Sequence, residues 1–376
     1  MERQAAAVRT DKYFDYILLF LIIFLLGFGL VMLYSVSAYE AQSEFGDATY
    51  YLTHQIRNIV IGLVFMVAAT MIPYKFWSRL SVSRLAYGIA LFLCVAVLFV
   101  GQTSNGSTRW LSVGGIQFQP SEFAKLAVII YLAAVLSRMP KKIEKWGTVL
   151  SVILRLAPII VAIAFNNLTT ALIIAGICVM MMFVVSPKYS HFIVLLILVA
   201  AVIVIFTMLS SYRGDRISAW LHPEQYPDSA YQTLQGMYAI GSGGIFGKGL
   251  GGSIQKLGYV PEAQNDFIFS IICEELGIFG GVCVIALFGL MIWRFMIISN
   301  NSADLFGSLL VVGVMSHIAL QVILNLAVVT NSIPNTGVIL PFFSYGGSSM
   351  IFLLAEMGLV LSVSRGILLD ASPRAE

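Results

Sequence analysis

The chain has 376 residues, of which 59% are hydrophobic and only 11% are charged. Soluble domains carry about 25% charged residues, so this composition excludes an ordinary soluble enzyme. The net charge of +3 is too small to indicate binding to nucleic acid, and no nucleic-acid partner is expected. With a mean hydropathy of +0.90, the chain is predicted to be a polytopic membrane protein.

Ten apolar segments follow one another along the chain, and each is long enough, with its flanks, to cross a bilayer as a helix of about 20 residues. They are Tyr16–Tyr34, Ile59–Ile72, Leu85–Val100, Phe123–Leu136, Val149–Phe165, Thr170–Val185, Ile193–Leu209, Phe267–Trp293, Leu305–Val329 and Ser348–Val363. The predicted fold class is an all-α polytopic membrane protein with about ten transmembrane helices, which form one transmembrane domain over residues 1–376.

The distribution of Lys and Arg predicts the orientation, because cytoplasmic loops are enriched in positive charge. An N-terminus inside the cell places most of the 22 basic residues on the cytoplasmic side. The predicted topology is therefore N-in and C-in. Residues 210–265, between the seventh and eighth helices, then form a large extracytoplasmic loop. Its tryptophan and tyrosines argue against disorder, so a packed cap is expected.

A charged pair opens the fourth predicted helix. Glu122 and Lys125 are three residues apart, so they share one face of a helix and can form an ion pair. Pro120 and Ser121, just before them, are typical of a helix start. Ionisable groups beside membrane spans are costly and are therefore candidates for function. Two interpretations stay open, a structural tether of the helix end and a part of a polar substrate site.

Asp266 stands at the outer mouth of the eighth predicted helix, directly before an apolar run. One role for such a carboxylate is an N-cap, which satisfies free backbone N–H groups and the helix dipole. The other role is that of a general base at the membrane surface. The residues alone favour the cap. Glu275 lies deeper in the same helix and is expected to need a partner or a raised pKa.

A glycine-rich run from Gly241 to Gly252 contains Lys248 and belongs to the same long loop as Arg213 and Arg216. Closely spaced glycines let backbone N–H groups approach a phosphate, and the three cations can add charge. However, the run lacks the Gly-Lys-Ser/Thr ending of a nucleotide-binding P-loop. It is interpreted either as a phosphate site or as a flexible re-entrant turn.

The ninth and tenth predicted helices are joined by a segment rich in helix breakers, Ser332 to Ser349, which includes Ser344. Irregular backbone at membrane depth is tolerated only where protein or water covers it. The segment, with Gln321 and Asn325 just before it, is therefore predicted to line a polar cavity. The alternative is a kinked helical hairpin.

In this order, these features resemble the SEDS family of cell-wall polymerases, whose members include FtsW and RodA, over essentially the whole chain. The run from Gln255 to Glu262 is more similar to FtsW than to RodA. One position departs from the family, because its common Asp at the start of the sixth helix is Asn167 here. The stretches that carry the resemblance are Arg109-Trp110, Gln119 to Lys125, Ala239 to Gly251, Pro261 to Gly277 and Pro334 to Ser349.

The resemblance implies a peptidoglycan glycosyltransferase that joins lipid II, an undecaprenyl-diphosphate disaccharide-pentapeptide, into glycan strands at the outer face of the bacterial cytoplasmic membrane. It also implies a role in cell division, with a class B penicillin-binding protein, other division proteins and membrane lipid as partners. Asp266 matches the family's catalytic Asp and is expected to be the general base of an inverting transfer.

The residues expected to bind the substrate and its diphosphate are Arg109, Trp110, Glu122, Lys125, Arg213, Arg216, Lys248 and Ser344. A divalent cation could take over part of their work, and no other cofactor is expected. Two further function classes stay open, a lipid II flippase and a non-catalytic scaffold that activates a penicillin-binding protein. The polar clusters gather on the outer side rather than at the midplane, which counts against a transporter.

Overall fold

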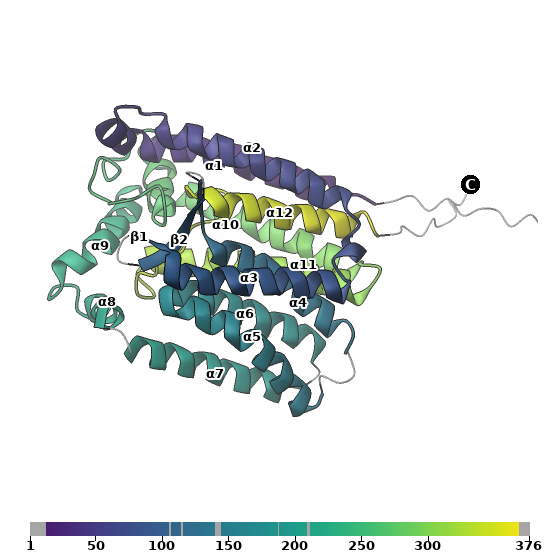
Figure 1. The fold of residues 1–376 in the computed structure, drawn as a ribbon. Helices are drawn as coiled ribbons and strands as arrows, with labels where there is room; N and C mark the ends of the chain where they lie inside the picture. The colour runs from purple at the N-terminus through teal and green to yellow at the C-terminus, as the bar shows by residue number, and fades with distance from the viewer. Residues whose placement is uncertain are drawn as a thin grey trace, which may run out of the picture.

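The computed structural model describes residues 13–104, 107–113, 116–139, 144–186, 188–208 and 211–367. Each of the ten predicted spans corresponds to one helix, and the helices lie side by side in an elongated bundle (Figure 1). They are α1 (Tyr16–Phe45), α2 (Tyr50–Met71), α3 (Leu80–Val100), α4 (Pro120–Leu136), α5 (Trp146–Asn166), α6 (Leu168–Val185), α7 (Tyr189–Met208), α10 (Ile268–Asn300), α11 (Leu305–Val329) and α12 (Gly347–Ser364). Among the described residues, eight of these helices are long and apolar enough to cross a membrane, judged by their length and composition alone. The predicted helical membrane fold is confirmed.

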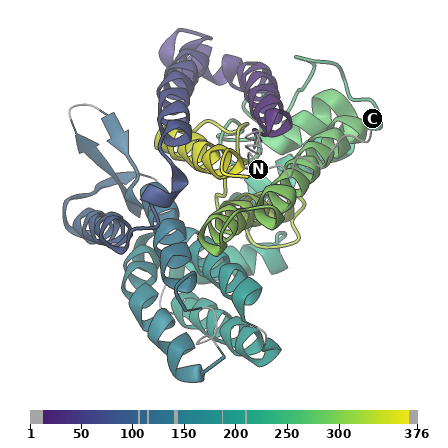
Figure 2. The same cartoon turned by 90° about the vertical axis from the view of Figure 1, so that its right-hand side faces the viewer.

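Helix α4 is the most deeply enclosed element of the bundle. Of its 17 residues, all except Phe123 are buried, whereas most of the other helices keep an exposed apolar face. Surrounding helices shield α4 from lipid, so it can be shorter than the 20 or so residues that a lipid-exposed span requires. The view along the bundle shows α4 among its neighbours (Figure 2). Because Glu122 and Lys125 lie in its first turns, their charges are placed inside protein.

Helices α2 and α12 approach each other closely because small residues line their contact. A Cβ atom on Gly358 of α12 would collide with the backbone oxygen of Met66 in α2. A Cβ atom on Gly62 would lie 2.6 Å from Cδ1 of Leu354. Small residues at helix contacts are the usual means by which membrane helices bring their backbones together. This contact fixes α12, and with it the segment that precedes α12.

Both ends of the described chain lie at the same end of the bundle. The backbone N–H of Tyr13 donates to the carbonyl of Ile367 at 3.2 Å. Asp15, which caps α1, forms a buried ion pair with Arg294 of α10 at 2.6 Å. This arrangement agrees with an even number of spans. Which end faces the cytoplasm stays a prediction.

The opposite end of the bundle carries the long connections. Helices α8 (Ser211–Leu221) and α9 (Pro227–Ser242) fold within the predicted 210–265 loop. A small antiparallel sheet, β1 (Gln102–Ser104), β2 (Ser107–Val113) and β3 (Ile116–Phe118), lies at the same end (Figure 1). The sheet was not predicted, although Asn105-Gly106 and Gly114-Gly115 are typical hairpin dipeptides.

Candidate active site

The carboxylate of Asp266 does not cap helix α10. The helix begins at Ile268, its N-cap residue is Phe267, and no side chain makes the capping hydrogen bond. The capping interpretation of Asp266 is therefore wrong. The residue lies just outside the helix and is only 9% exposed. Its side chain is thus available for another task although it is largely withdrawn from water.

A single amide group fixes the backbone around Asp266. Nδ2 of Asn325, in α11, donates to the carbonyl of Asp266 at 2.7 Å and to the carbonyl of Val338 at 2.7 Å. Asn325 is fully buried. It thereby joins the Asp266 turn to residues 332–346, the segment between α11 and α12, which we call the breaker segment. The amide holds together two pieces of chain that are far apart in sequence.

The breaker segment passes directly beside the Asp266 carboxylate at Gly337. A Cβ atom on Gly337 would lie 3.8 Å from Oδ2 of Asp266, and Gly337 has a φ of +66°. A residue with a side chain would be strained in this left-handed conformation. Glycine therefore allows the backbone to turn next to the carboxylate.

Burial, together with the negative charge of Glu262, raises the pKa of Asp266 to about 7. The backbone N–H of Asp266 and the positive charge of Arg216 act in the opposite direction. A carboxylate with a pKa near neutrality holds a proton far better than an ordinary Asp does. It also still ionises near neutral pH. Such a group is suited to general-base catalysis.

Arg216, in α8, is a predicted site residue whose positive charge acts on this carboxylate. Its Nη1 donates to the carbonyl of Asn335 at 2.9 Å, and Nε1 of Trp220, one turn later, donates to the carbonyl of Asn331 at 2.9 Å. Helix α8 is thereby held against the breaker segment and the residue that precedes it. The side chain of Arg213 lies outside the described residues.

The predicted ion pair of Glu122 and Lys125 is confirmed. Nζ of Lys125 lies 3.0 Å from Oε2 of Glu122, and the side chains of Lys125 and Glu122 are 2% and 9% exposed, respectively. Charges this deeply buried are stable only in each other's presence. The pair is therefore a fixed feature of the bundle interior.

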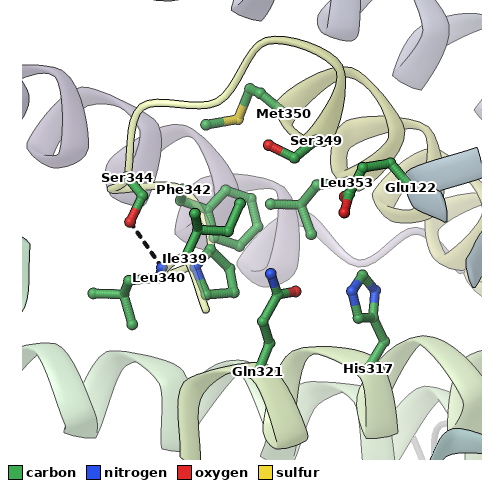
Figure 3. Close-up of a pocket in the computed structure, with 11 residues that line it drawn as sticks. Glu122, His317, Gln321, Ile339, Leu340, Phe342, Ser344, Ser349, Met350 and Leu353 are labelled. Atoms are coloured by element: carbon green, nitrogen blue, oxygen red, sulfur yellow. Dashed lines mark hydrogen bonds between the residues drawn. The ribbon is translucent and has the colours of Figure 1, made fainter. Parts of the chain in front are cut away.

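Glu122 also lines a small cavity beneath the breaker segment. The side chains of Glu122, His317, Gln321 and Ser349 point into this space from α4, α11 and α12 (Figure 3). The remaining lining residues are Ile339, Leu340, Pro341, Phe342, Ser344, Met350 and Leu353. The prediction that this segment lines a cavity is confirmed, and residues 332–346 do not form the alternative helical hairpin.

Ser344 holds the wall of this cavity in place. Its Oγ accepts a hydrogen bond from the backbone N–H of Leu340 at 2.8 Å (Figure 3), and its carbonyl accepts one from Nε2 of Gln55 at 3.2 Å. The hydroxyl thus closes a turn of the breaker segment. The breaker segment passes both Asp266 and the cavity, since Gly337 borders Asp266 and Leu340 borders the cavity.

A second buried pair at the cavity was missed by the sequence analysis. Nδ1 of His317 lies 2.7 Å from Oε2 of Glu356, near the middle of α11 and α12. Nothing local predicts this pair, because the two residues lie in different helices and each is surrounded by apolar residues in sequence.

Arg109 and Trp110 lie on strand β2, where Trp110 pairs in register with Gln102. Nε of Arg109 donates to the carbonyl of Asn166 at 3.1 Å, at the end of α5. The next residue, Asn167, caps α6 by accepting the backbone N–H of Thr170 at 3.1 Å. The amide oxygen of Asn can accept this hydrogen bond as a carboxylate does, so the loss of the family's common Asp leaves the cap intact.

Lys248 has a partner of its own. Its Nζ lies 2.6 Å from Oε1 of Glu274, a side chain of α10 that is fully buried. The backbone N–H groups of Lys248 and Gly249 donate to the carbonyls of Glu274 and Glu275 at 3.0 and 2.9 Å. We call residues 243–259 the glycine loop. Helix α10 therefore occupies two of the N–H groups of the run and the charge of Lys248, which counts against the interpretation of the run as a phosphate cradle.

No group of three or more His, Cys, Asp and Glu side chains within the described ranges could hold a metal ion.

The family model for cell cycle proteins of the FtsW, RodA and SpoVE type matches residues 16–367. Stage V sporulation protein E of Bacillus subtilis (strain 168) is 40% identical, over 93% of this chain and 97% of its own length. The probable peptidoglycan glycosyltransferase FtsW of the same strain is 36% identical, over 94% of this chain and 91% of its own length. A chain from a solved peptidoglycan synthase complex has a TM-score of 0.78 at 29% identity and covers 94% of this chain and 98% of that chain. The protein belongs to the FtsW/RodA/SpoVE family of cell cycle proteins, which is the SEDS family.

Proposed function

We propose that this multi-pass protein of the bacterial cytoplasmic membrane is a peptidoglycan glycosyltransferase, which polymerises lipid II by inverting transfer with Asp266 as general base. The observation that carries the proposal is the state of Asp266. It is buried, it is not used as a helix cap, and its pKa is raised to about 7. Relatives named as probable peptidoglycan glycosyltransferases, such as the FtsW of Bacillus subtilis, support the reaction class.

In this reaction, a hydroxyl oxygen of the acceptor sugar attacks the anomeric carbon of the lipid-linked donor. The new carbon–oxygen bond forms as the bond between the anomeric carbon and the diphosphate breaks, and the electron pair leaves with the diphosphate. The hydroxyl proton passes to a carboxylate oxygen of Asp266. An α-linked donor and a β-linked product require inversion, so one base is sufficient and no covalent glycosyl-enzyme is formed.

The departing diphosphate carries negative charge, and preorganised cationic side chains lower the activation free energy by stabilising that charge. Arg216 is suited to this role because its charge acts on Asp266 directly. Arg109 and Lys125 are further candidates, from β2 and α4. Lys248 is the weakest candidate, because Glu274 already neutralises its charge.

The breaker segment connects Asp266, the proposed base, with the buried cavity. Gly337 borders Asp266, and Leu340 and Ser344 border the space into which Glu122 points. A polar sugar or diphosphate bound beside Asp266 would contact the breaker segment at Gly337. The lipid tail would then extend into the surrounding bilayer.

We propose a class B penicillin-binding protein as partner and cell division as the process. The solved peptidoglycan synthase complex, which contains a chain of this fold, supports the partner class. The relatives include both a sporulation protein and FtsW, so sporulation is the competing role. Depletion of the protein in growing cells is expected to give filaments without septa. Normal growth together with a defect confined to spores would assign it to sporulation instead.

The activity is tested with purified protein and its penicillin-binding partner, whose transpeptidase serine is replaced so that only glycan strands are scored. Labelled lipid II is expected to be converted into strands. A folded, correctly assembled complex that makes none contradicts the proposal. In that case, lipid II movement across vesicles would identify a flippase, and stimulation of the partner alone would identify a scaffold.

The rate of polymerisation is expected to depend on pH through Asp266. Because the ionised carboxylate is the base and its pKa is about 7, the rate should rise with pH and level off above neutrality. Replacing Arg216 by Gln removes a charge that lowers this pKa, so the midpoint should move to higher pH. The measurement is the initial rate of strand synthesis at saturating lipid II, from about pH 5.5 to about pH 9. A midpoint that does not move in Arg216→Gln contradicts the electrostatic contact.

A further inference from the structure

The glycine loop presents an apolar surface to its surroundings. Ile245, Phe246, Leu250 and Ile254 are 66%, 79%, 59% and 54% exposed, respectively, and they lie within ten consecutive residues. Single exposed apolar residues are common on proteins, but four of them within ten residues indicate an interaction surface. The kind of surface follows from the polar groups of the same loop.

The backbone of the loop is hydrogen-bonded to a break in helix α10. Gly277, within α10, has a φ of +73° and interrupts the helix. The carbonyls of Gly244 and Ile245 accept the N–H groups that follow the break, those of Ile278 and Phe279, at 2.9 and 3.1 Å. The loop in turn donates to the carbonyls that precede the break. Non-helical backbone can enter a membrane only when protein satisfies its polar groups in this way.

The charges of the loop are neutralised as well. Its only charged side chains are Lys248 and Lys256. The first lies 2.6 Å from Oε1 of Glu274, and the second lies 2.7 Å from Oε1 of Glu275, both in α10. A loop that faces water has no need to pair each of its cations with a buried carboxylate. Pairing of this kind is expected where the surroundings have a low dielectric constant.

Two polar layers show how deep the loop lies. At one end of the bundle, Asp15 pairs with Arg294, and at the other Oγ of Ser35 donates to Oε1 of Glu275 at 2.8 Å. The stretch from Asp15 to Ser35 along α1 spans roughly 30 Å, at about 1.5 Å per residue, and α10 reaches the same two layers through Arg294 and Glu275. This separation equals the thickness of a hydrocarbon core, about 30 Å.

Phe246 lies on the hydrocarbon side of the second layer. Its ring pairs with that of Phe279, with centroids 6.5 Å apart, and Phe279 lies one turn beyond Glu275 toward the middle of α10. Phe279 and Val282 are themselves 63% and 57% exposed on this transmembrane helix. The apolar face of the loop therefore continues the lipid-facing surface of α10.

We propose that the glycine loop is a re-entrant membrane anchor, with Ile245, Phe246, Leu250 and Ile254 inserted among the acyl chains of the leaflet on the Asp266 side. The partner is the lipid surface itself. The loop runs on into the Asp266 turn, so its insertion sets the height of Asp266 relative to the membrane. This inference concerns membrane contact alone and holds whether or not Asp266 is the catalytic base.

The anchor is tested by the accessibility of a nitroxide label in lipid nanodiscs that contain the purified protein alone. Cys283 is replaced by Ala, because Cys94, Cys178 and Cys273 are buried. The label is then placed at Phe246→Cys. Collision with a water-soluble nickel chelate is expected to be several-fold weaker, and collision with oxygen several-fold stronger, than at a water-exposed site.

The two control sites define the scale. Glu224→Cys places the label on a side chain 67% exposed in the turn between α8 and α9, and Val282→Cys places it on the lipid-facing side of α10. Phe246→Cys is expected to behave like Val282→Cys. Values equal to those of Glu224→Cys would show that the loop lies in water and would overturn the proposal.

A second measurement uses the unmodified protein and so does not depend on the folding of a labelled variant. A phospholipid that carries a diazirine within its acyl chain is photolysed in the same nanodiscs, and the labelled peptides are identified by mass. Residues 245–250 are expected to be labelled about as strongly as residues 278–285. Labelling confined to the helices would contradict the anchor.

Discussion

Asp266→Asn is expected to lower the rate of glycan polymerisation by about 10²–10⁴-fold, the usual contribution of a general base. Asn has the same shape but cannot accept the hydroxyl proton. The backbone contact with Asn325 uses the carbonyl of residue 266, so the substitution leaves that hydrogen bond in place. The measurement is the yield of glycan strands from lipid II, with the penicillin-binding partner present.

The same variant is expected to be at least as stable as the wild type, because burial disfavours the ionised carboxylate. Since the pKa of Asp266 is about 7 when folded and 3.8 ordinarily, the folded state binds the proton more tightly. The contribution of this carboxyl group to the free energy of unfolding is fully present below about pH 4 and is lost as the pH rises to about 7. The loss amounts to roughly 4 kcal/mol at most, at about 1.36 kcal/mol per tenfold change in affinity. Asn does not ionise, so Asp266→Asn should lack this decline in thermal unfolding experiments.

Glu262→Gln is the matched control for Asp266→Asn. It removes an exposed carboxylate from the same turn, whose charge raises the pKa of Asp266. It should retain polymerisation and move the midpoint of the pH–rate profile to lower pH. If Asp266→Asn and Glu262→Gln polymerise lipid II equally well, Asp266 is not the base.

Lys125→Ala is expected to cause a large loss of stability, about 3–5 kcal/mol in the free energy of unfolding. The change leaves Glu122 without its partner in the interior of the bundle. Activity should be lost as well. Thermal unfolding in detergent and strand synthesis per folded molecule separate the two effects.

The double variant Glu122→Gln with Lys125→Met decides between the two interpretations of the pair. It removes both charges and keeps the approximate volumes, so much of the stability should return. If the pair contributes to the substrate site, activity stays low although the protein is stable. Recovery of activity together with stability would show that the pair is only a tether.

Asp15→Asn with Arg294→Met is a control at the other end of the bundle. That pair is also buried, with a contact of 2.6 Å, and it joins α1 to α10 far from the breaker segment. Loss of this pair is expected to change stability without changing the rate per folded molecule. A rate loss equal to that of the Glu122–Lys125 variant would show that any buried pair has this effect.

The sequence alone determined the features that depend on neighbours along the chain. The ten spans follow from the length of their apolar runs, since a helix that crosses a bilayer satisfies its own backbone. The pair of Glu122 and Lys125 follows from a spacing of three residues on one helix. The cavity at residues 332–346 follows from helix breakers at membrane depth, which protein or water must cover.

Tertiary structure decided the features that depend on distant residues. The residues around Asp266 favour a helix cap, and only the start of α10 at Ile268, without any side-chain capping hydrogen bond, excludes that role. Lys248 reads as a phosphate ligand, but the fold brings it to Glu274, 26 residues further along the chain. The charge of a side chain can be read from the sequence, whereas its partner and its burial depend on which helices pack together. Composition and periodicity therefore predict where charged residues occur, and only the folded bundle shows which residues they contact.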